Sequence, residues 1–488
     1  MNVVPSAEHP GPTPGWTVAV VACAAQFMVV LDTTIVNVAL PSMREDLGLG
    51  AEGQQWVVNA YLLTFAGFLM LGGRAADLFG RRRMFTAGLV LFTAASLLGG
   101  LATGGGLLIA ARTLQGLGAA FLAPAPLALI NATYRDVQAR TKAIAAWGAT
   151  ATAAGSCGIL LGGVLTDALG WRWVLFVNVP IGAVLVAVAL RALPASGGRA
   201  RGRALDVPGA VLVTAALAGA AYGLSELETR PLSSLPTGGV LAVAVVLLAA
   251  FVTVEARSAQ PLMPLRILRS RALVLGNAAA LVIGAVTTSV MFFVTLYLQR
   301  VLGYEPLQAG LAMLPLTLAI AVASLLVRRV VQAMGPRLPL ALGWLLTAGG
   351  LLWQSRFAPD GSFGVDILGP GILLGLGLGT VVLPMTAAAT SGVAAEDAGL
   401  ASALMNTARQ MGGGLGLAVL SAVAGTATGT AALTHGYAKA LLVATVLSLV
   451  AGALALFMPR RAAAAAPAAV PGDEPGQRPA PVAAEPAE

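Results

Sequence analysis

Long apolar segments recur along the whole of this sequence, separated by short polar stretches. Fourteen segments are about 20 residues long, which an α-helix needs to cross a hydrocarbon layer of roughly 30 Å. Hydrophobic residues make up 57% of the chain and charged residues only 10%, far from the balance of a soluble domain. The sequence therefore predicts an all-α polytopic membrane protein with 14 spans. They are 17–40, 54–73, 84–103, 106–131, 143–165, 173–193, 207–225, 237–255, 273–297, 308–327, 338–354, 366–390, 399–425 and 436–458.

The positive charges are distributed unevenly between the two sides of this arrangement. If the N-terminus lies inside the cell, 21 of the 29 Lys and Arg residues fall on that side, in loops, in the tail or, for Arg191, at the end of a span. Such a bias predicts that both termini are cytoplasmic. It also accounts for the net charge of +8 without a nucleic-acid partner. No basic stretch precedes the first span, so we expect no cleaved signal peptide.

Composition also divides the chain along its length. A basic, Gly-rich stretch at 194–203 follows the sixth span, and an Ala/Pro-rich stretch follows the last span. We therefore expect an N-terminal six-helix bundle at 1–193, a linker with two extra transmembrane helices at 194–258, a C-terminal six-helix bundle at 259–461, and a disordered cytoplasmic tail at 462–488.

The first span contains one acid, Asp32, in the stretch VVLDTTIVNVALP. An ionised Asp near the middle of a membrane helix costs about 2.5–3.5 kcal/mol on insertion scales. Gln26, Thr33 and Asn37 share one helix face, and Asp32 projects roughly 120° away from Gln26. Polar groups on two faces predict a helix enclosed by neighbours and by a cavity, in which Asp32 has a function. A purely structural acid that only hydrogen-bonds its neighbours is the alternative.

Two other spans carry a cation. The fourth span places Arg112 on one face with Gln115, and an intramembrane Arg needs partners inside the protein. Bonding of Arg112 to backbone carbonyls alone is the structural alternative. The span 399–425 has a comparable polar face that includes Asn406 and Arg409.

The stretch SVMFFVTLYL (289–298) supplies an apolar face. Its Met291, Phe292 and Tyr297 are suited to line an adaptable apolar pocket, although core packing is the alternative for all three.

The loop after the second span, GGRAADLFGRRRMF (72–85), suggests a latch. Gly73 and Gly80 bracket Asp77, and Arg81 and Arg82 follow. An acid near a helix end can pair with an Arg or with a neighbouring helix N-terminus. We therefore expect a contact that holds two helices together at the cytoplasmic surface; a plain basic loop is the alternative.

Several of these motifs, in this order, resemble those of the major facilitator superfamily. The loop matches the family signature at Gly73, Asp77, Gly80, Arg81 and Arg82, with Leu78 where a basic residue is usual. The stretches LDTTIVNVALP (31–41), WRWVLFVNVPIG (171–182) and AGLASALMNTARQMGGGLG (398–416) resemble the fourteen-helix drug:proton antiporters. The resemblance implies a major facilitator fold, with two six-helix bundles plus two extra transmembrane helices.

The fifth span has small residues at Gly155, Gly158, Gly162 and Gly163, which permit close helix packing. This pattern resembles the motif that marks antiporters of the superfamily, with Ile159 in place of its proline. Packing alone is the alternative reading.

The resemblance implies a proton-coupled antiporter that exports hydrophobic or amphipathic, cationic drugs by alternating access. Asp32 and Arg112 would couple protons to transport. The substrate would contact residues from three spans, namely Gln26, Asn37, Met291, Phe292, Tyr297, Asn406 and Arg409.

The other expectations are set mostly by what the sequence lacks. No GxxxxGK[ST] loop is present, so ATP-driven transport is disfavoured, and we expect no cofactor, no metal and no enzymatic activity. The partners would be a small drug-like molecule, protons and the lipid bilayer of a bacterial plasma membrane, with the monomer as the working unit. A metabolite importer or symporter on the same scaffold is the main alternative. A membrane enzyme is the second, and no HExxH or Cys/His set supports it.

Overall fold

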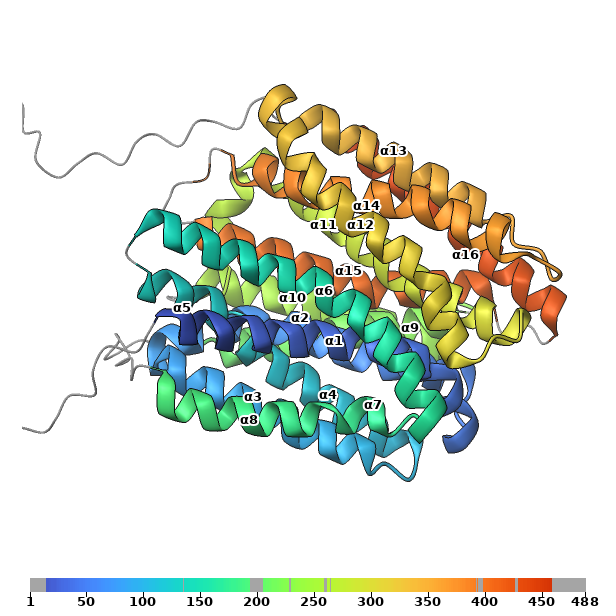
Figure 1. The fold of residues 1–488 in the computed structure, drawn as a ribbon, viewed down its shortest axis with the longest axis horizontal. Helices are drawn as coiled ribbons and strands as arrows, with labels where there is room; N and C mark the ends of the chain where they lie inside the picture. Colours follow the sequence, from blue (N-terminus) through green and yellow to red (C-terminus); the bar gives the residue numbers. More distant parts are fainter. Residues whose placement is uncertain are drawn as a thin grey trace, which may run out of the picture.

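The computed structural model describes residues 15–134, 136–193, 205–227, 230–258, 261–263, 265–391, 393, 398–425 and 429–458. Within these ranges the regular structure is helical, and the long helices run roughly side by side (Figure 1). The expected linker at 194–203 and the expected tail at 462–488 lie outside the described residues.

The helices fall into three groups along the chain. We call the first group the first bundle: α1 (Gly15–Leu47), α2 (Ala51–Phe79), α3 (Arg81–Gly100), α4 (Gly105–Leu122), α5 (Ala125–Thr133), α6 (Val137–Leu169), α7 (Trp173–Phe176) and α8 (Asn178–Ala192). The hairpin consists of α9 (Val207–Glu226) and α10 (Val240–Arg257). The second bundle consists of α11 (Arg271–Leu296), α12 (Pro306–Met334), α13 (Arg337–Gln354), α14 (Gly369–Ala389), α15 (Ala398–Ala424) and α16 (Thr430–Ala455).

Local sequence explains where several helices begin. The side chain of Asp136 accepts a hydrogen bond from the backbone N–H of Ala139 at 2.7 Å and caps α6. Asp206 caps α9 in the same way, because a side-chain oxygen satisfies an N–H that the first helical turn leaves free. At Gly80, between α2 and α3, φ is +100°, a conformation that favours glycine.

Among the described residues, twelve helical segments are long and apolar enough to cross a membrane. The predicted spans 338–354 and 399–425 coincide with α13 and α15, which fall outside that set. Helix α13 has only 18 residues and begins with Arg337, and α15 carries Asn406 and Arg409 in its middle. The structure thus confirms the all-helical membrane architecture, and the count of fourteen spans stays a prediction.

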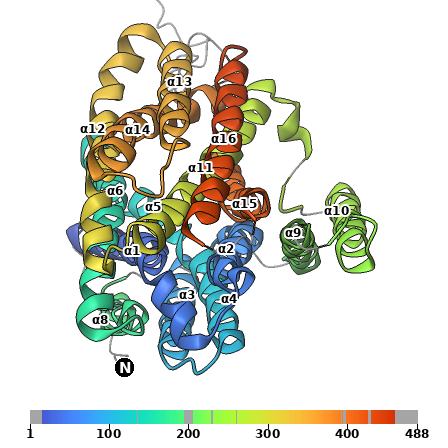
Figure 2. The same ribbon diagram turned by 90° about the vertical axis from the view of Figure 1, so that its right-hand side faces the viewer.

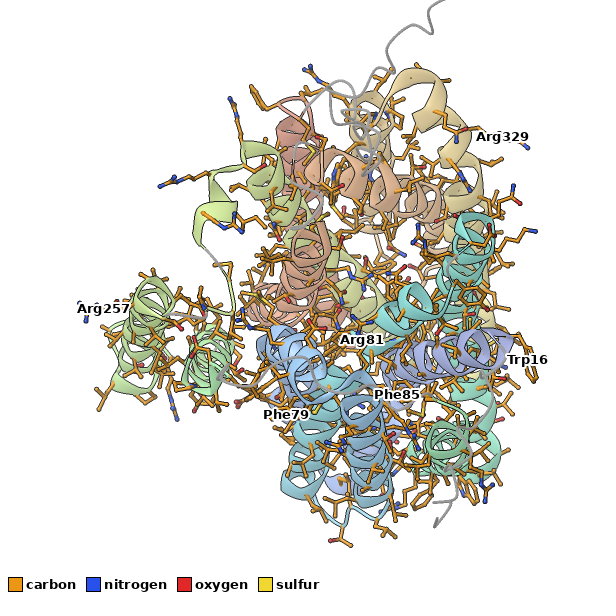
Figure 3. All side chains as sticks on the ribbon, turned by 90° about the vertical axis from the view of Figure 1, so that its left-hand side faces the viewer. Trp16, Phe79, Arg81, Phe85, Arg257 and Arg329 are labelled. Carbon is orange, nitrogen blue, oxygen red and sulfur yellow. The ribbon has the colours of Figure 1, made fainter. Side chains whose placement is uncertain are left out.

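The helices define two ends of the molecule. We call the end at which α1 begins and α16 ends the terminal side, and the opposite end the distal side. Figure 3 looks onto the terminal side, where Arg257 of α10 and Arg329 of α12 lie at opposite edges and Arg81 lies between them.

The two bundles pack tightly against each other toward the distal side. A Cβ added at Gly163 of α6 would lie 2.7 Å from Leu307 Cα of α12. One added at Gly310 of α12 would lie 2.8 Å from the carbonyl oxygen of Ile159. Helices α6 and α12 therefore approach backbone to backbone at this end. Nearby, the Gln299 amide donates a hydrogen bond of 2.9 Å to the Val38 carbonyl of α1.

Toward the terminal side, α6 lacks such neighbours. A Cβ added at Gly148 or at Gly155 would have no atom within 4 Å. The same helix is therefore closely packed at one end and open along the other. We conclude that the two bundles meet at the distal side and separate along α6 toward the terminal side.

The hairpin stands beside the two bundles, next to α2 and α15 (Figure 2). At its terminal end, Glu255 accepts hydrogen bonds from the backbone N–H groups of Leu262 (3.2 Å) and Met263 (2.9 Å). Arg74 at the end of α2 donates to the Pro261 carbonyl at 2.7 Å. The short segment that leaves the hairpin is thus fixed both to α10 and to the first bundle.

Apolar contacts of α9 divide between the bundles. Ala210 forms a small buried cluster with Leu71 of α2 and with Leu262. Farther along α9, Leu217 packs in a second cluster with Leu63 of α2 and Ala418 of α15. The hairpin therefore touches both bundles, at different levels of the membrane. The assignment of the helix groups as separate domains stays a prediction.

Candidate functional site

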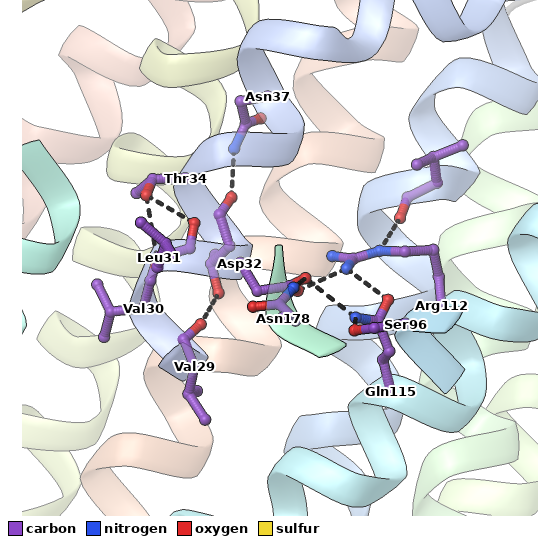
Figure 4. Close-up of polar contacts among 12 residues, drawn as sticks. Val29, Val30, Leu31, Asp32, Thr34, Asn37, Ser96, Arg112, Gln115 and Asn178 are labelled. Atoms are coloured by element: carbon purple, nitrogen blue, oxygen red, sulfur yellow. Dashed lines mark hydrogen bonds and ion pairs between the residues drawn. The ribbon is translucent and has the colours of Figure 1, made fainter. Parts of the chain in front are cut away.

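Asp32 lies at the centre of a buried polar network inside the first bundle (Figure 4). Its Oδ2 accepts a hydrogen bond from Arg112 Nη1 at 2.6 Å, and this contact is also an ion pair. Its Oδ1 accepts from Gln115 Nε2 at 3.0 Å and from Asn178 Nδ2 at 2.9 Å. Asp32 is fully buried and Arg112 is 2% exposed. The acid is thus enclosed by three donors from α4 and α8.

Arg112 has further partners that fix its position. Its Nε donates to the Val57 carbonyl of α2 at 3.1 Å, and its Nη1 also donates to Gln115 Oε1 at 2.9 Å. Its guanidinium carbon lies 4.4 Å from the centre of the Tyr61 ring, within cation–π range. Gln115 also donates to Ser96 of α3 at 2.6 Å. We call Asp32, Arg112, Gln115, Ser96 and Asn178 the Asp32 network.

The Asp32 carboxylate joins α1 to α4 and α8, and Gln115 extends the network to α3. Adding a proton to Asp32 would cancel the charge that holds Arg112 and would turn one carboxylate oxygen from an acceptor into a donor. The carboxylate accepts three hydrogen bonds, one on Oδ2 and two on Oδ1, and all three are strengthened by its negative charge, so protonation would weaken them. Charge and helix packing are coupled at this point because every donor belongs to a helix other than α1.

The sequence reasoning identified Asp32 and Arg112, and the structure brings the two together. It missed Asn178, Ser96 and Tyr61 as their neighbours. A signal was present at Asn178, which is a single amide in the apolar stretch VLFVNVPIG. Nothing comparable distinguishes Ser96 or Tyr61 from ordinary residues of a buried helix.

The other polar face of α1 is not part of the network. Gln26 is half-buried, with no hydrogen bond to another described side chain. Asn37 is buried, and its amide donates to the Thr33 carbonyl one turn earlier at 2.7 Å. Its Oδ1 is buried without a hydrogen-bond partner. The two predicted substrate contacts on α1 are therefore placed apart from Asp32.

Asn406 and Arg409 lie together in the middle of α15, where Arg409 Nη2 donates to Asn406 Oδ1 at 3.0 Å. Arg409 is exposed although α15 packs against α2 of the first bundle and α11 of the second. A cation in mid-membrane needs water or a partner rather than lipid. Its position indicates a hydrated space between the bundles.

The three apolar candidates on α11 and just after it are placed differently from one another. Phe292 is buried and lines a cavity on the distal side, whereas Met291 is half-buried against the core. Tyr297 stacks on Phe357, with ring centres 3.8 Å apart, and its hydroxyl donates to the Ala358 carbonyl at 2.7 Å. Tyr297 is therefore bound to a distal loop in this state, and the substrate role of all three stays a prediction.

The residues of the expected latch lie on the terminal side. Asp77 is 70% exposed on its side chain and lies 3.7 Å from Arg81 Nη2. Arg81 also donates to the Ala128 carbonyl of α5 at 3.0 Å, and Arg82 donates to the Leu190 carbonyl of α8. These bonds join α3 to its neighbours within the first bundle. In this state the described contacts of Asp77 do not reach the second bundle.

The glycine motif of α6 is divided between two environments. A Cβ at Gly158 would lie 3.0 Å from the Leu31 carbonyl of α1, and one at Gly162 would lie 2.9 Å from that of Ile35. Gly163 meets α12, as described above, whereas Gly155 faces open space. Three of the four glycines thus sit where backbones touch.

In the described residues, no three His, Cys, Asp or Glu side chains gather as metal ligands would.

Comparison with known proteins agrees with this architecture. The family model of the Major Facilitator Superfamily matches residues 22–417. The chain belongs to this superfamily. As a major facilitator protein it is embedded in the membrane and crosses it many times, as the twelve apolar segments require.

Curated relatives cover most of this major facilitator chain. It is 46% identical over 400 residues to the cephamycin export protein CmcT of Amycolatopsis lactamdurans, covering 81% of this chain and 82% of that protein. It is 41% identical to the puromycin resistance protein pur8 of Streptomyces alboniger, covering 84% and 82%. It is 35% identical to the lincomycin resistance protein of Streptomyces lincolnensis, covering 81% and 82%.

Proposed function

We propose that this protein exports antibiotic-like compounds across the bacterial plasma membrane in exchange for protons. Relatives named for cephamycin export and for resistance to puromycin and lincomycin support the export of drugs. The Asp32 network carries the proton part of the proposal. It is a buried, ionisable centre held by donors from several helices.

Proton coupling would follow from the loss of the negative charge that attracts Arg112 and the two amide donors. With Asp32 ionised, α1 is bonded to α4 through Arg112 and Gln115, and to α8 through Asn178. A proton on Asp32 weakens these bonds and allows the helices to rearrange. Proton binding then biases the equilibrium between two arrangements of the bundles, because the two arrangements hold the proton with different affinity.

The structure corresponds to one end of that cycle. The bundles meet at the distal side through Gly163 and Gly310 and separate along α6 toward the terminal side. We propose that both termini are cytoplasmic, which makes this the state that receives drug from inside the cell. The expected latch at Asp77 would then form in the opposite state, when the terminal side closes.

The drug would bind in the hydrated space between the bundles. Gln26 and Asn37 on α1 and Asn406 on α15 supply amides that can bond to it. The proposal includes hydrophobic and amphipathic substrates. It does not require a cationic substrate, because the exposed Arg409 would repel a cation bound beside it.

The experiment compares wild type with Asp32→Asn in a strain that lacks its own efflux pumps. Asn keeps the shape of the side chain but cannot ionise. A drug panel with wild type should show resistance to at least one compound, and Asp32→Asn should lose it while still reaching the membrane. Asp46→Asn is the matched control, because Asp46 forms an exposed ion pair with Arg172 on the distal side.

Everted vesicles then test the coupling. Adding a resisted drug to wild-type vesicles should release protons from the acidified interior, and Asp32→Asn should abolish this release. Wild-type proton movement with Asp32→Asn would remove Asp32 from coupling. Proton movement in the opposite direction would favour an importer.

A further inference from the structure

A second polar cavity lies on the distal side, remote from the Asp32 network. It has a volume of about 220 Å³ and is formed where α1 and α11 end, α2 begins, α15 ends and α16 begins. Neither Asp32 nor Arg409 lines it. It is therefore distinct from both the proposed proton site and the space between the bundles on the terminal side.

Two buried amides with unsatisfied donors stand in the wall of this cavity. Gln54 and Gln55, at the start of α2, are 1% and 4% exposed, and both line the cavity. The Nε2 atom of each is buried and has no hydrogen-bond partner. A buried donor without an acceptor costs about 1–3 kcal/mol. An acceptor-bearing ligand would recover that cost.

Two guanidinium groups face the same space. Arg44 of α1 and Arg300, just after α11, both line the cavity and are partly buried. Neither forms an ion pair with a described residue. The acids nearby are Glu52, which lines the cavity and is exposed, and Glu45, which acts on Arg300 through its charge. Unpaired cations beside unsatisfied N–H donors are the groups that bind a carboxylate.

The remaining wall is aromatic. Phe292 and Phe293 pack edge to face with ring centres 5.3 Å apart, and Phe293 lies 5.5 Å from Tyr437. All three line the cavity. The lining of the cavity thus combines cations and amides with aromatic rings. A ligand that matches both kinds of group has an anionic head and a small apolar body.

We propose that this distal cavity binds organic carboxylates that carry an aromatic or aliphatic group. The carboxylate would bond to Arg44 and Arg300 and to the amides of Gln54 and Gln55, and the apolar body would pack on Phe292 and Phe293. This site is additional to the export function proposed above and does not depend on proton coupling. It gives the protein a second, outward-facing place for anionic amphiphiles.

Binding of 4-phenylbutyrate to the purified full-length protein in detergent tests the proposal by calorimetry and thermal stability. The wild type should bind the carboxylate saturably and gain stability, whereas 4-phenyl-1-butanol should bind at least tenfold more weakly. Arg300→Gln should weaken carboxylate binding at least tenfold. Arg356→Gln is the matched control, because it removes an exposed distal arginine that does not line the cavity. Its affinity should stay that of wild type.

Two further variants keep the result decisive. Gln55→Leu removes an unsatisfied donor, so it should raise the thermal stability of the ligand-free protein and weaken the carboxylate at the same time. Arg409→Gln removes the cation of the other space. Binding that disappears with Arg409→Gln but survives Arg300→Gln would overturn the proposal, as would equal affinity for the acid and the alcohol. Failure of this site leaves the Asp32→Asn transport result unaffected.

Discussion

The two bundles differ in how they hold their fourth membrane helix, because among the described residues only the first adds a buried ion pair. In the first bundle, α4 carries Arg112 and Gln115, which bond to an acid and to a backbone carbonyl of neighbouring helices. In the second bundle, α14 has no ionisable residue and is held by close glycine contacts, which α4 also makes, since a Cβ at Gly118 would lie 2.7 Å from the Phe92 nitrogen of α3. A Cβ at Gly379 would lie 2.8 Å from Ala323 Cβ of α12, and one at Gly377 would lie 2.8 Å from the Gly343 carbonyl of α13.

The two kinds of helix contact differ in their sensitivity to protons. Backbone-to-backbone packing is insensitive to protons, whereas a buried ion pair changes when a proton arrives. Within helices α11–α16, the described residues form no ion pair. Under the proposed function, the first bundle would therefore respond to protons, and the second would supply a packing surface against which it moves.

The largest effect should follow from breaking the buried pair. Arg112→Met leaves Asp32 buried without its cation, and removing one partner of such a pair costs about 3–5 kcal/mol. We expect a large fall in melting temperature for the purified protein. Arg409→Met removes an exposed cation from the second bundle and should change stability little. If both variants melt at the same temperature, the contrast between the bundles is wrong.

A moderate effect should follow from a single methyl group in the second bundle. A Cβ at Gly350 of α13 would lie 2.7 Å from the Leu374 backbone nitrogen of α14. Gly350→Ala should therefore cost about 1–3 kcal/mol, the usual range for overpacking. The adjacent Gly349→Ala meets only Leu373 Cδ2 at 3.6 Å and should be neutral or slightly stabilising. Equal melting temperatures for the two variants would show that close packing does not hold this bundle.

The smallest effect should follow from Asp77→Asn, which tests whether the first bundle acts on the second at the terminal side. Exposed pairs are worth about 0–1 kcal/mol, so the populations of the two states should shift by no more than about fivefold. Loss of the latch should favour the present state. Labelling of Gly148→Cys should rise and that of Leu307→Cys should fall.

The labelling experiment needs a background in which Cys23 and Cys157 are replaced by Ser, because both thiols are free. Asp136→Asn, which alters a different acid on the terminal side, serves as the control. Unchanged labelling at both positions, together with full transport, would remove Asp77 from the mechanism.

Apolar length and helical periodicity were enough to predict the membrane helices and the presence of an enclosed acid on α1. They also separated Asp32 from Gln26 on the helix surface, and the structure places the two in different surroundings. These features are local, since they depend on residues within one helix. The shared role of Asp32 and Arg112 in proton coupling came from the resemblance to the superfamily, and the structure adds their direct contact.

The rest depended on contacts between distant segments. Asn178 bonds to Asp32 across 146 positions of sequence, and no periodicity records such a pairing. Tyr297 was expected beside a pocket because it shares a stretch with Phe292, but its ring stacks on Phe357 from a later loop. The open and closed ends of α6 were also beyond prediction, since the same glycine spacing serves both.

The attachment of the hairpin has a consequence for how the protein must move. Arg74 and Leu71 of α2 contact Pro261 and Leu262 at the terminal end of the hairpin. Leu217 of α9 contacts α15 farther toward the distal side. When the distal ends part, α9 has to give up one of these partners. The contacts with α2 include hydrogen bonds as well as apolar packing, so we expect the hairpin to move with the first bundle. The hinge between the bundles is then expected after residue 263, with α9 sliding along the surface of α15 as the bundles move.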